Sequence, residues 1–147
     1  MTIQVSTPGR AVVATVIRVL VVFDTVALLF AGIVHLAGAR IPLGAAVFDE
    51  PPLIPAGIVE GLAGVVFVFA AYAVFARRPW AWPVALAAHL FAIAGFIVGL
   101  VVTRQGTTPF NYDYHRVMLV VFVIGLILLL LPAGRSALSG VQPRESV

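Results

Sequence analysis

The chain has 147 residues, of which 62% are hydrophobic and only 10% are charged, and its mean hydropathy is +1.13. This composition leaves too little polar surface for a soluble globular domain and indicates an integral membrane protein in contact with the lipid bilayer. The absence of cysteine excludes disulfides, Cys-ligated metals and thiol redox chemistry. The net charge of +3 comes from nine scattered arginines without a basic stripe, which argues against nucleic-acid binding.

Four apolar segments are long enough to cross a membrane. A bilayer core of about 30 Å needs roughly 20 apolar residues in a helix. The segments predict an all-α fold, a polytopic membrane protein with a four-transmembrane-helix bundle, forming one domain over residues 1–147. The predicted helices cover about 12–39, 54–76, 80–103 and 117–131, and residues 136–147 are predicted to form a polar tail.

The arginines also predict the orientation. If the N-terminus is cytoplasmic, six of the nine arginines fall on the cytoplasmic side, as the positive-inside rule requires. We therefore expect both termini in the cytoplasm and the segment from Arg40 to Pro52 outside, and the expected location is the bacterial plasma membrane. The six are Arg10, Arg18, Arg77, Arg78, Arg135 and Arg144.

The first predicted helix carries two ionisable residues on one face. Asp24 and His35 are eleven residues apart, which corresponds to about 20° more than three full turns. Ionisable groups in lipid cost roughly 2.5–3.5 kcal/mol on insertion scales, so they normally face the bundle interior or a cavity. We expect His35 near the outer membrane edge and Asp24 roughly 16 Å deeper.

Glu60 lies one to two turns inside the outer end of the second predicted helix, at a depth similar to that of His35. His115 is expected to start the fourth helix on the same side. The three side chains are therefore predicted to converge on an outer-facing polar pocket. Glu60 is flanked by apolar residues, and burial of its carboxylate is costly unless a cation, a histidine or a metal pairs with it.

His89 enters the third predicted helix from the inner side and reaches a depth close to that of Asp24. A carboxylate and an imidazole at this depth reduce each other's burial cost, so Asp24 and His89 are predicted to form a buried polar pair. The motifs Gly57-xxx-Gly61 and Gly95-xxx-Gly99 are predicted to pack helices closely.

These residues support several functions. In the leading interpretation the pocket binds a quinone or a similar lipophilic ligand, with Glu60 as the catalytic proton-exchanging group and His35 and His115 bonded to the ligand head. In a second, His35, Glu60 and His115 bind a transition metal, or the two histidines bind a haem. A third is a proton-coupled carrier that uses Asp24, His89 and Glu60 as a relay. A fourth is a non-catalytic scaffold or homo-oligomer built on the glycine-rich faces.

Several short segments of the chain point to a known family. They are Arg18, Leu29-Phe-Ala-Gly-Ile-Val-His35-Leu, Pro55-Ala-Gly-Ile-Val-Glu60-Gly-Leu-Ala-Gly64, the Arg77-Arg78 turn and Gly134-Arg-Ser-Ala-Leu. Together they resemble the DoxX-like superfamily of small four-helix membrane proteins. The resemblance implies a four-helix bundle associated with quinone-linked oxidoreductase systems, with a membrane or soluble oxidoreductase as partner. Glu60 matches the acid of the second helix in that family, whereas His89 and the segment from Asn111 to His115 lie outside the resemblance.

Overall fold

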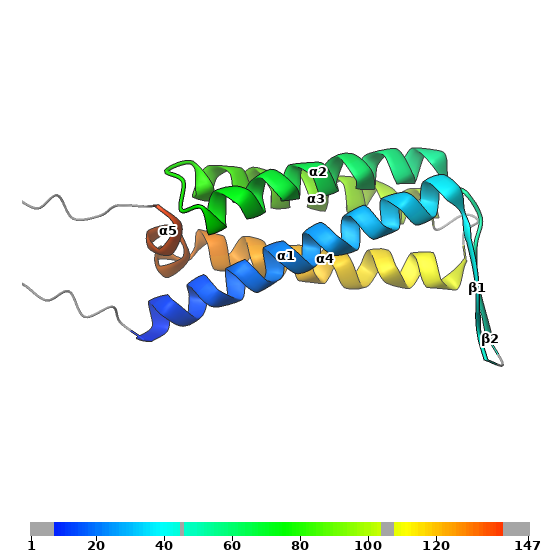
Figure 1. Cartoon of the computed structure of the whole chain (residues 1–147), viewed down its shortest axis with the longest axis horizontal. Helices are drawn as coiled ribbons and strands as arrows, with labels where there is room; N and C mark the ends of the chain where they lie inside the picture. Colours follow the sequence, from blue (N-terminus) through cyan, green and yellow to red (C-terminus); the bar gives the residue numbers. More distant parts are fainter. Residues whose placement is uncertain (1–7, 45, 104–107, 140–147) are drawn as a thin grey trace, which may run out of the picture.

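The computed structural model describes residues 8–44, 46–103 and 108–139. Figure 1 shows the long helices packed side by side, with a short helix at one end and a β-hairpin at the other. We call these ends the α5 end and the hairpin end, and the architecture confirms the predicted all-α bundle. The elements are α1 (Pro8–Ala37), β1 (Ala39–Leu43), β2 (Ala46–Glu50), α2 (Ile54–Phe75), α3 (Ala81–Thr103), α4 (Pro109–Leu130) and α5 (Pro132–Leu138).

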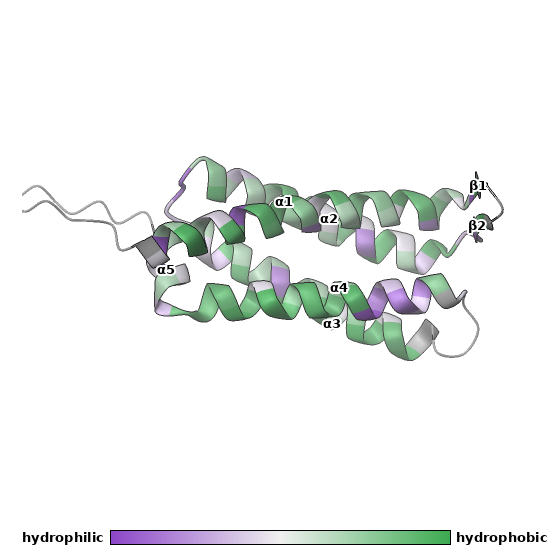
Figure 2. Ribbon diagram, turned by 90° about the horizontal axis from the view of Figure 1, so that it is seen from below, coloured by the Kyte–Doolittle hydropathy of each residue, from purple (hydrophilic) through white to green (hydrophobic). Residues whose placement is uncertain are grey.

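The bundle has the surface of an integral membrane protein. Its four long helices, α1 to α4, are each long and apolar enough to cross a bilayer. Val12, Val19, Val26 and Ile33 recur every seven residues along α1, and each is more than 60% exposed, so they form a stripe that faces outward. Figure 2 shows apolar residues along all four long helices, with the polar residues of α4 grouped toward the hairpin end.

The contact between α1 and α2 depends on glycine. A methyl group added at Gly32 of α1 would lie 2.9 Å from the backbone nitrogen of Gly61 in α2. One added at Gly57 would lie 2.9 Å from the backbone nitrogen of Leu36. Gly57-xxx-Gly61 therefore lies where two helix backbones meet, as expected of a packing motif.

Helix α4 begins at Pro109 and not near residue 117 as predicted. Thr108 caps it, since its side-chain oxygen accepts a hydrogen bond from the backbone nitrogen of Asn111 at 3.2 Å, and Pro109 occupies the first turn. His115 therefore lies in the second turn of α4 and not at its start. The polar residues before residue 117 led to the late predicted start. In α4 they lie on two faces of the helix, where Asn111 and His115 are buried and Asp113 is exposed.

The chain continues beyond α4 as helix α5. No helix was predicted after about residue 131, but Pro132 occupies the first turn of α5. The guanidinium of Arg10 at the start of α1 donates a hydrogen bond to the carbonyl of Ser136 at 2.5 Å, and Leu138 is buried. The predicted polar tail is thus helical up to residue 138, and residues 140–147 lie outside the described part.

The segment between α1 and α2, predicted as an external loop, contains an antiparallel β-hairpin. Ala39 pairs with Glu50 and Leu43 pairs with Ala46. The Phe48 ring contacts the Phe110 ring edge-on, with 4.8 Å between the ring centroids. The Thr108 hydroxyl donates a hydrogen bond to the buried Glu50 carboxylate. These contacts attach the hairpin to the N-terminus of α4.

Candidate functional site

Polar side chains from three helices meet inside the bundle near the hairpin end. They are His35 on α1, Glu60 on α2, and Asn111 and His115 on α4, and each is at most 3% exposed. Three of them were predicted from the sequence to lie together. Asn111 was not singled out as a site residue, although its position four residues before His115 places both on one helix face.

His35 is held from two sides. Its Nδ1 lies 2.5 Å from Oε2 of Glu60, and its Nε2 lies 3.2 Å from the amide nitrogen of Asn111. An amide nitrogen only donates, so Nε2 of His35 accepts and Nδ1 carries the ring hydrogen. The imidazole therefore donates to the Glu60 carboxylate, and both of its ring nitrogens are occupied.

His115 faces the other oxygen of the same carboxylate. Its Nδ1 donates to the backbone carbonyl of Asn111 at 2.9 Å, and its Nε2 lies 3.9 Å from Oε1 of Glu60, which is too far for a hydrogen bond. Gly99 of α3 makes room for the ring, since an added methyl group would lie 2.5 Å from Nε2. Oε1 of Glu60 is buried and has no hydrogen-bond partner among the described residues.

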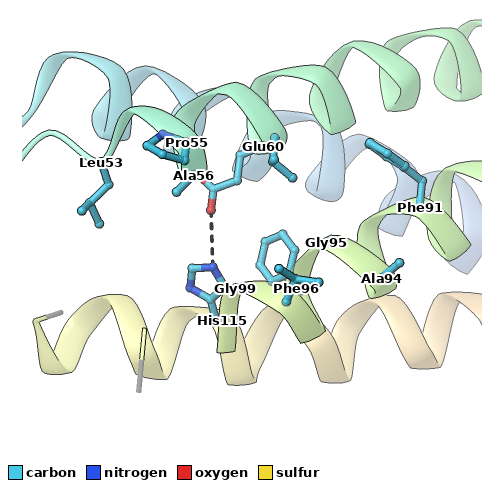
Figure 3. Close-up of a pocket in the computed structure, with 12 residues that line it drawn as sticks. Leu53, Pro55, Ala56, Glu60, Phe91, Ala94, Gly95, Phe96, Gly99 and His115 are labelled. Atoms are coloured by element: carbon cyan, nitrogen blue, oxygen red, sulfur yellow. Dashed lines mark ion pairs between the residues drawn. The ribbon is translucent and has the colours of Figure 1, made fainter. Parts of the chain in front are cut away.

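A cavity of about 430 Å³ lies between α2 and α3 and reaches α4 at His115. Of its twelve lining residues, only Glu60 and His115 carry polar side chains, and Figure 3 shows them facing each other. Val59 and Val98 line the cavity and are also 40% and 62% exposed, so it opens on the lipid-facing surface. Its volume falls within the usual range for small-molecule sites. His35 was expected to contact the ligand, but it lies behind Glu60 and is not among the lining residues.

Asp24 and His89 meet deeper in the bundle. Nε2 of His89 lies 3.5 Å from Oδ2 of Asp24, and both side chains are at most 1% exposed. The imidazole donates from Nδ1 to the Ala85 carbonyl at 2.8 Å. In neutral His89 the bare Nε2 therefore faces a carboxylate oxygen, and attraction requires a proton on one of the two residues. Within the described part of the chain, neither carboxylate oxygen has a hydrogen-bond partner.

Two of the three buried histidines, His89 and His115, share one arrangement. Each donates from Nδ1 to the carbonyl four residues earlier and directs Nε2 toward a carboxylate on another helix. Each ring also lies against a glycine of a neighbouring helix, because a methyl group added at Gly125 would clash with Nε2 of His89. The fold thus places a histidine–carboxylate pair at each of two depths.

The side-chain geometry gives little support to a metal or haem site. In the parts of the chain with described coordinates, no three His, Asp or Glu side chains form a group suited to a metal ion. As an axial haem ligand or a metal ligand, His35 would have to give up its bond to Glu60 or to Asn111.

Comparison of the chain with protein-family models, with curated proteins and with solved structures gave no match. Its function is therefore inferred from the chemistry of the site.

Proposed function

We propose that the protein binds a lipophilic ligand of quinone type in the cavity between α2 and α3, as a small membrane component of a redox system. One observation carries the proposal. The buried Oε1 of Glu60 has no hydrogen-bond partner in the described structure and borders a cavity that is otherwise almost entirely apolar. An unpaired buried acceptor costs about 1–3 kcal/mol, and a ligand head group that bonds to it recovers this cost.

The cavity walls fit a ligand with one polar end and an apolar body. Phe91 and Phe96 supply aromatic surface, while Glu60 and His115 supply the polar groups. The opening beside Val98 lies on the lipid-facing surface. A ligand dissolved in the bilayer can therefore enter sideways and leave its tail among the lipids.

In this proposal Glu60 exchanges a proton with the ligand head. A hydroxyl of the ligand gives its proton to Oε1, and the reverse step returns it. His35 donates to Oε2 and so holds the carboxylate in position. Full conversion between quinol and quinone moves two protons and two electrons. Glu60 exchanges one proton, and an oxidoreductase partner exchanges the other proton and both electrons, in keeping with the DoxX-like resemblance.

A proton relay across the whole bundle has less support. Asp24 and His89 lie at mid-depth, but the core toward the α5 end consists of residues such as Ile17, Val21 and Ala81. Among the described residues, no buried titratable side chain continues the series toward that end. The observations therefore favour ligand binding over transmembrane proton transfer.

Calorimetric titration of the purified protein in lipid nanodiscs tests the proposal. The probes are decyl-hydroquinone and decyl-benzoquinone, and we expect saturable binding at one site for at least one of them. Ala94 lines the cavity on its exposed side, so Ala94→Phe should fill the opening and weaken binding at least tenfold without disturbing the core.

Ala87→Phe is the matched control. Ala87 lies two turns away on α3, is also exposed and does not line the cavity, so its replacement should leave binding unchanged. Equal binding to both variants, or no saturable binding to the native protein, would reject the cavity as the ligand site.

A further inference from the structure

We infer that this cavity selects the hydroxyl-bearing, reduced form of its ligand, so that a hydroquinone binds more tightly than the corresponding quinone. The inference rests on the proposed function, because it concerns the same cavity. It follows from which atoms at the polar end of the cavity donate hydrogen bonds and which accept them.

Asn111 determines the hydrogen positions on both histidines beside Glu60. Its side-chain amide donates to Nε2 of His35, which leaves the ring hydrogen on Nδ1. Its backbone carbonyl accepts from Nδ1 of His115, which leaves Nε2 of neutral His115 without a hydrogen. One residue thereby orients the donors of both rings away from the cavity.

The polar end of the cavity consequently presents two acceptors. They are Oε1 of Glu60 and Nε2 of His115, 3.9 Å apart. The only N–H group of the neutral His35 ring, at Nδ1, already donates to Oε2 on the far side of the carboxylate. The other lining side chains are apolar, so no lining side chain offers a hydrogen to the ligand.

A quinone carbonyl placed here would face two acceptors and leave both unsatisfied. A hydroquinone hydroxyl donates to the carboxylate and satisfies it. A hydrogen bond to a charged group contributes about 1.5–3 kcal/mol, which corresponds to a preference of roughly 10- to 150-fold for the reduced form.

Three compounds with the same decyl tail test whether hydrogen-bond donation, rather than the size or shape of the ligand, causes the preference. Decyl-hydroquinone carries donors, decyl-benzoquinone carries only acceptors, and the dimethyl ether of decyl-hydroquinone keeps the reduced ring without donors. Under anaerobic calorimetry of the native protein, the hydroquinone should bind at least tenfold more tightly than either of the others.

The variant Glu60→Gln changes the hydrogen-bonding character at nearly constant shape. The His35 N–H attracts the amide oxygen, so the amide NH₂ turns toward the cavity as a donor. The preference for hydroquinone over benzoquinone should then disappear or reverse. Asp113→Asn makes the same chemical change at an exposed acid of α4 and should leave the preference intact.

Equal or tighter binding of the benzoquinone to the native protein would overturn the inference alone, because the cavity would still bind the ligand class. Tight binding of the dimethyl ether would do the same. If none of the three compounds binds saturably, the proposed function fails and this inference fails with it. The comparison on the native protein stands even if the Glu60→Gln variant does not fold.

Discussion

At the residue scale, Glu60 and Asp24, the two acids buried on the long helices, differ in how well a histidine stabilises their carboxylates. Glu60 accepts a hydrogen bond from His35, whereas Asp24 meets His89 at 3.5 Å without a hydrogen bond of acceptable geometry. Both pairs are almost completely buried. The cost of breaking the Asp24–His89 pair should therefore depend strongly on which partner is removed.

Removal of His89 should be the more damaging change. His89→Leu leaves a buried carboxylate without its histidine partner and should lower the free energy of unfolding by about 3–5 kcal/mol. Asp24→Ala should cost less, since neutral His89 keeps its hydrogen bond to Ala85. The double variant Asp24→Ala/His89→Leu should recover much of the loss. Denaturant unfolding in detergent micelles measures all three, and a silent His89→Leu would show that the pair is not buried as described.

The variant Gly99→Ala tests the site without replacing Glu60 or His115. In Gly99→Ala the new methyl group would lie 2.5 Å from Nε2 of His115, so the imidazole must move. We expect ligand affinity to fall about tenfold, because Gly99 lines the cavity and the displaced ring and the new methyl group both crowd the bound ligand. Titration with decyl-hydroquinone measures it, and unchanged affinity would mean that the position of His115 is irrelevant to binding.

The sequence predicted some of these residues and not others. The depths of Asp24, His89, Glu60 and His115 follow from residue counts along a helix. The roles of Asn111 and Gly99 depend on how the helices are rotated against one another, which residue counts do not determine. Whether the predicted site residues bind a ligand stays a prediction until binding is measured.

At the scale of elements, glycine sets the distance between α1 and α2. Gly32→Ala should destabilise the protein by about 1–3 kcal/mol. The added methyl group would clash with the backbone of Gly61, and backbone atoms within a helix cannot move aside as a flexible side chain can. Gly9→Ala is the matched control on the same helix, where nothing lies within 4 Å of an added methyl group. It should be neutral or slightly stabilising, since alanine favours the helix. Thermal unfolding compares them, and equal stabilities would contradict the close packing.

The boundaries of α2 and α3 were predicted closely, whereas the start of α4 was predicted too late in the chain and α5 was not predicted. The polar run before His115 looked like a loop because hydropathy alone cannot distinguish a loop from a helix that buries a polar face. Thr108 followed by Pro109 is a helix-start signal, and Pro132 fits the first turn of a new helix as well as the end of an old one. The hairpin was missed because Pro42 lies within its first strand, and a proline inside a short run argues against a strand.

At the scale of the whole molecule, the structure places α5 and the turn between α2 and α3 at one end and the hairpin at the other (Figure 1). The arginine distribution predicts that the α5 end faces the cytoplasm. A reporter inserted at the exposed Gly44 turn should therefore be external, and one fused after Val147 should be cytoplasmic. The opposite result would reverse the orientation and make the site face the cytoplasm.

The central claim is that the buried carboxylate of Glu60 is the polar end of a ligand site that opens to lipid. A high-resolution experimental structure of the protein with decyl-hydroquinone tests it most directly. We predict ring density between Glu60 and His115, a hydroxyl within hydrogen-bond distance of Oε1, and a tail that leaves between α2 and α3 beside Val98. A ligand bound elsewhere, or a cavity filled by side chains that satisfy Oε1, would contradict the claim.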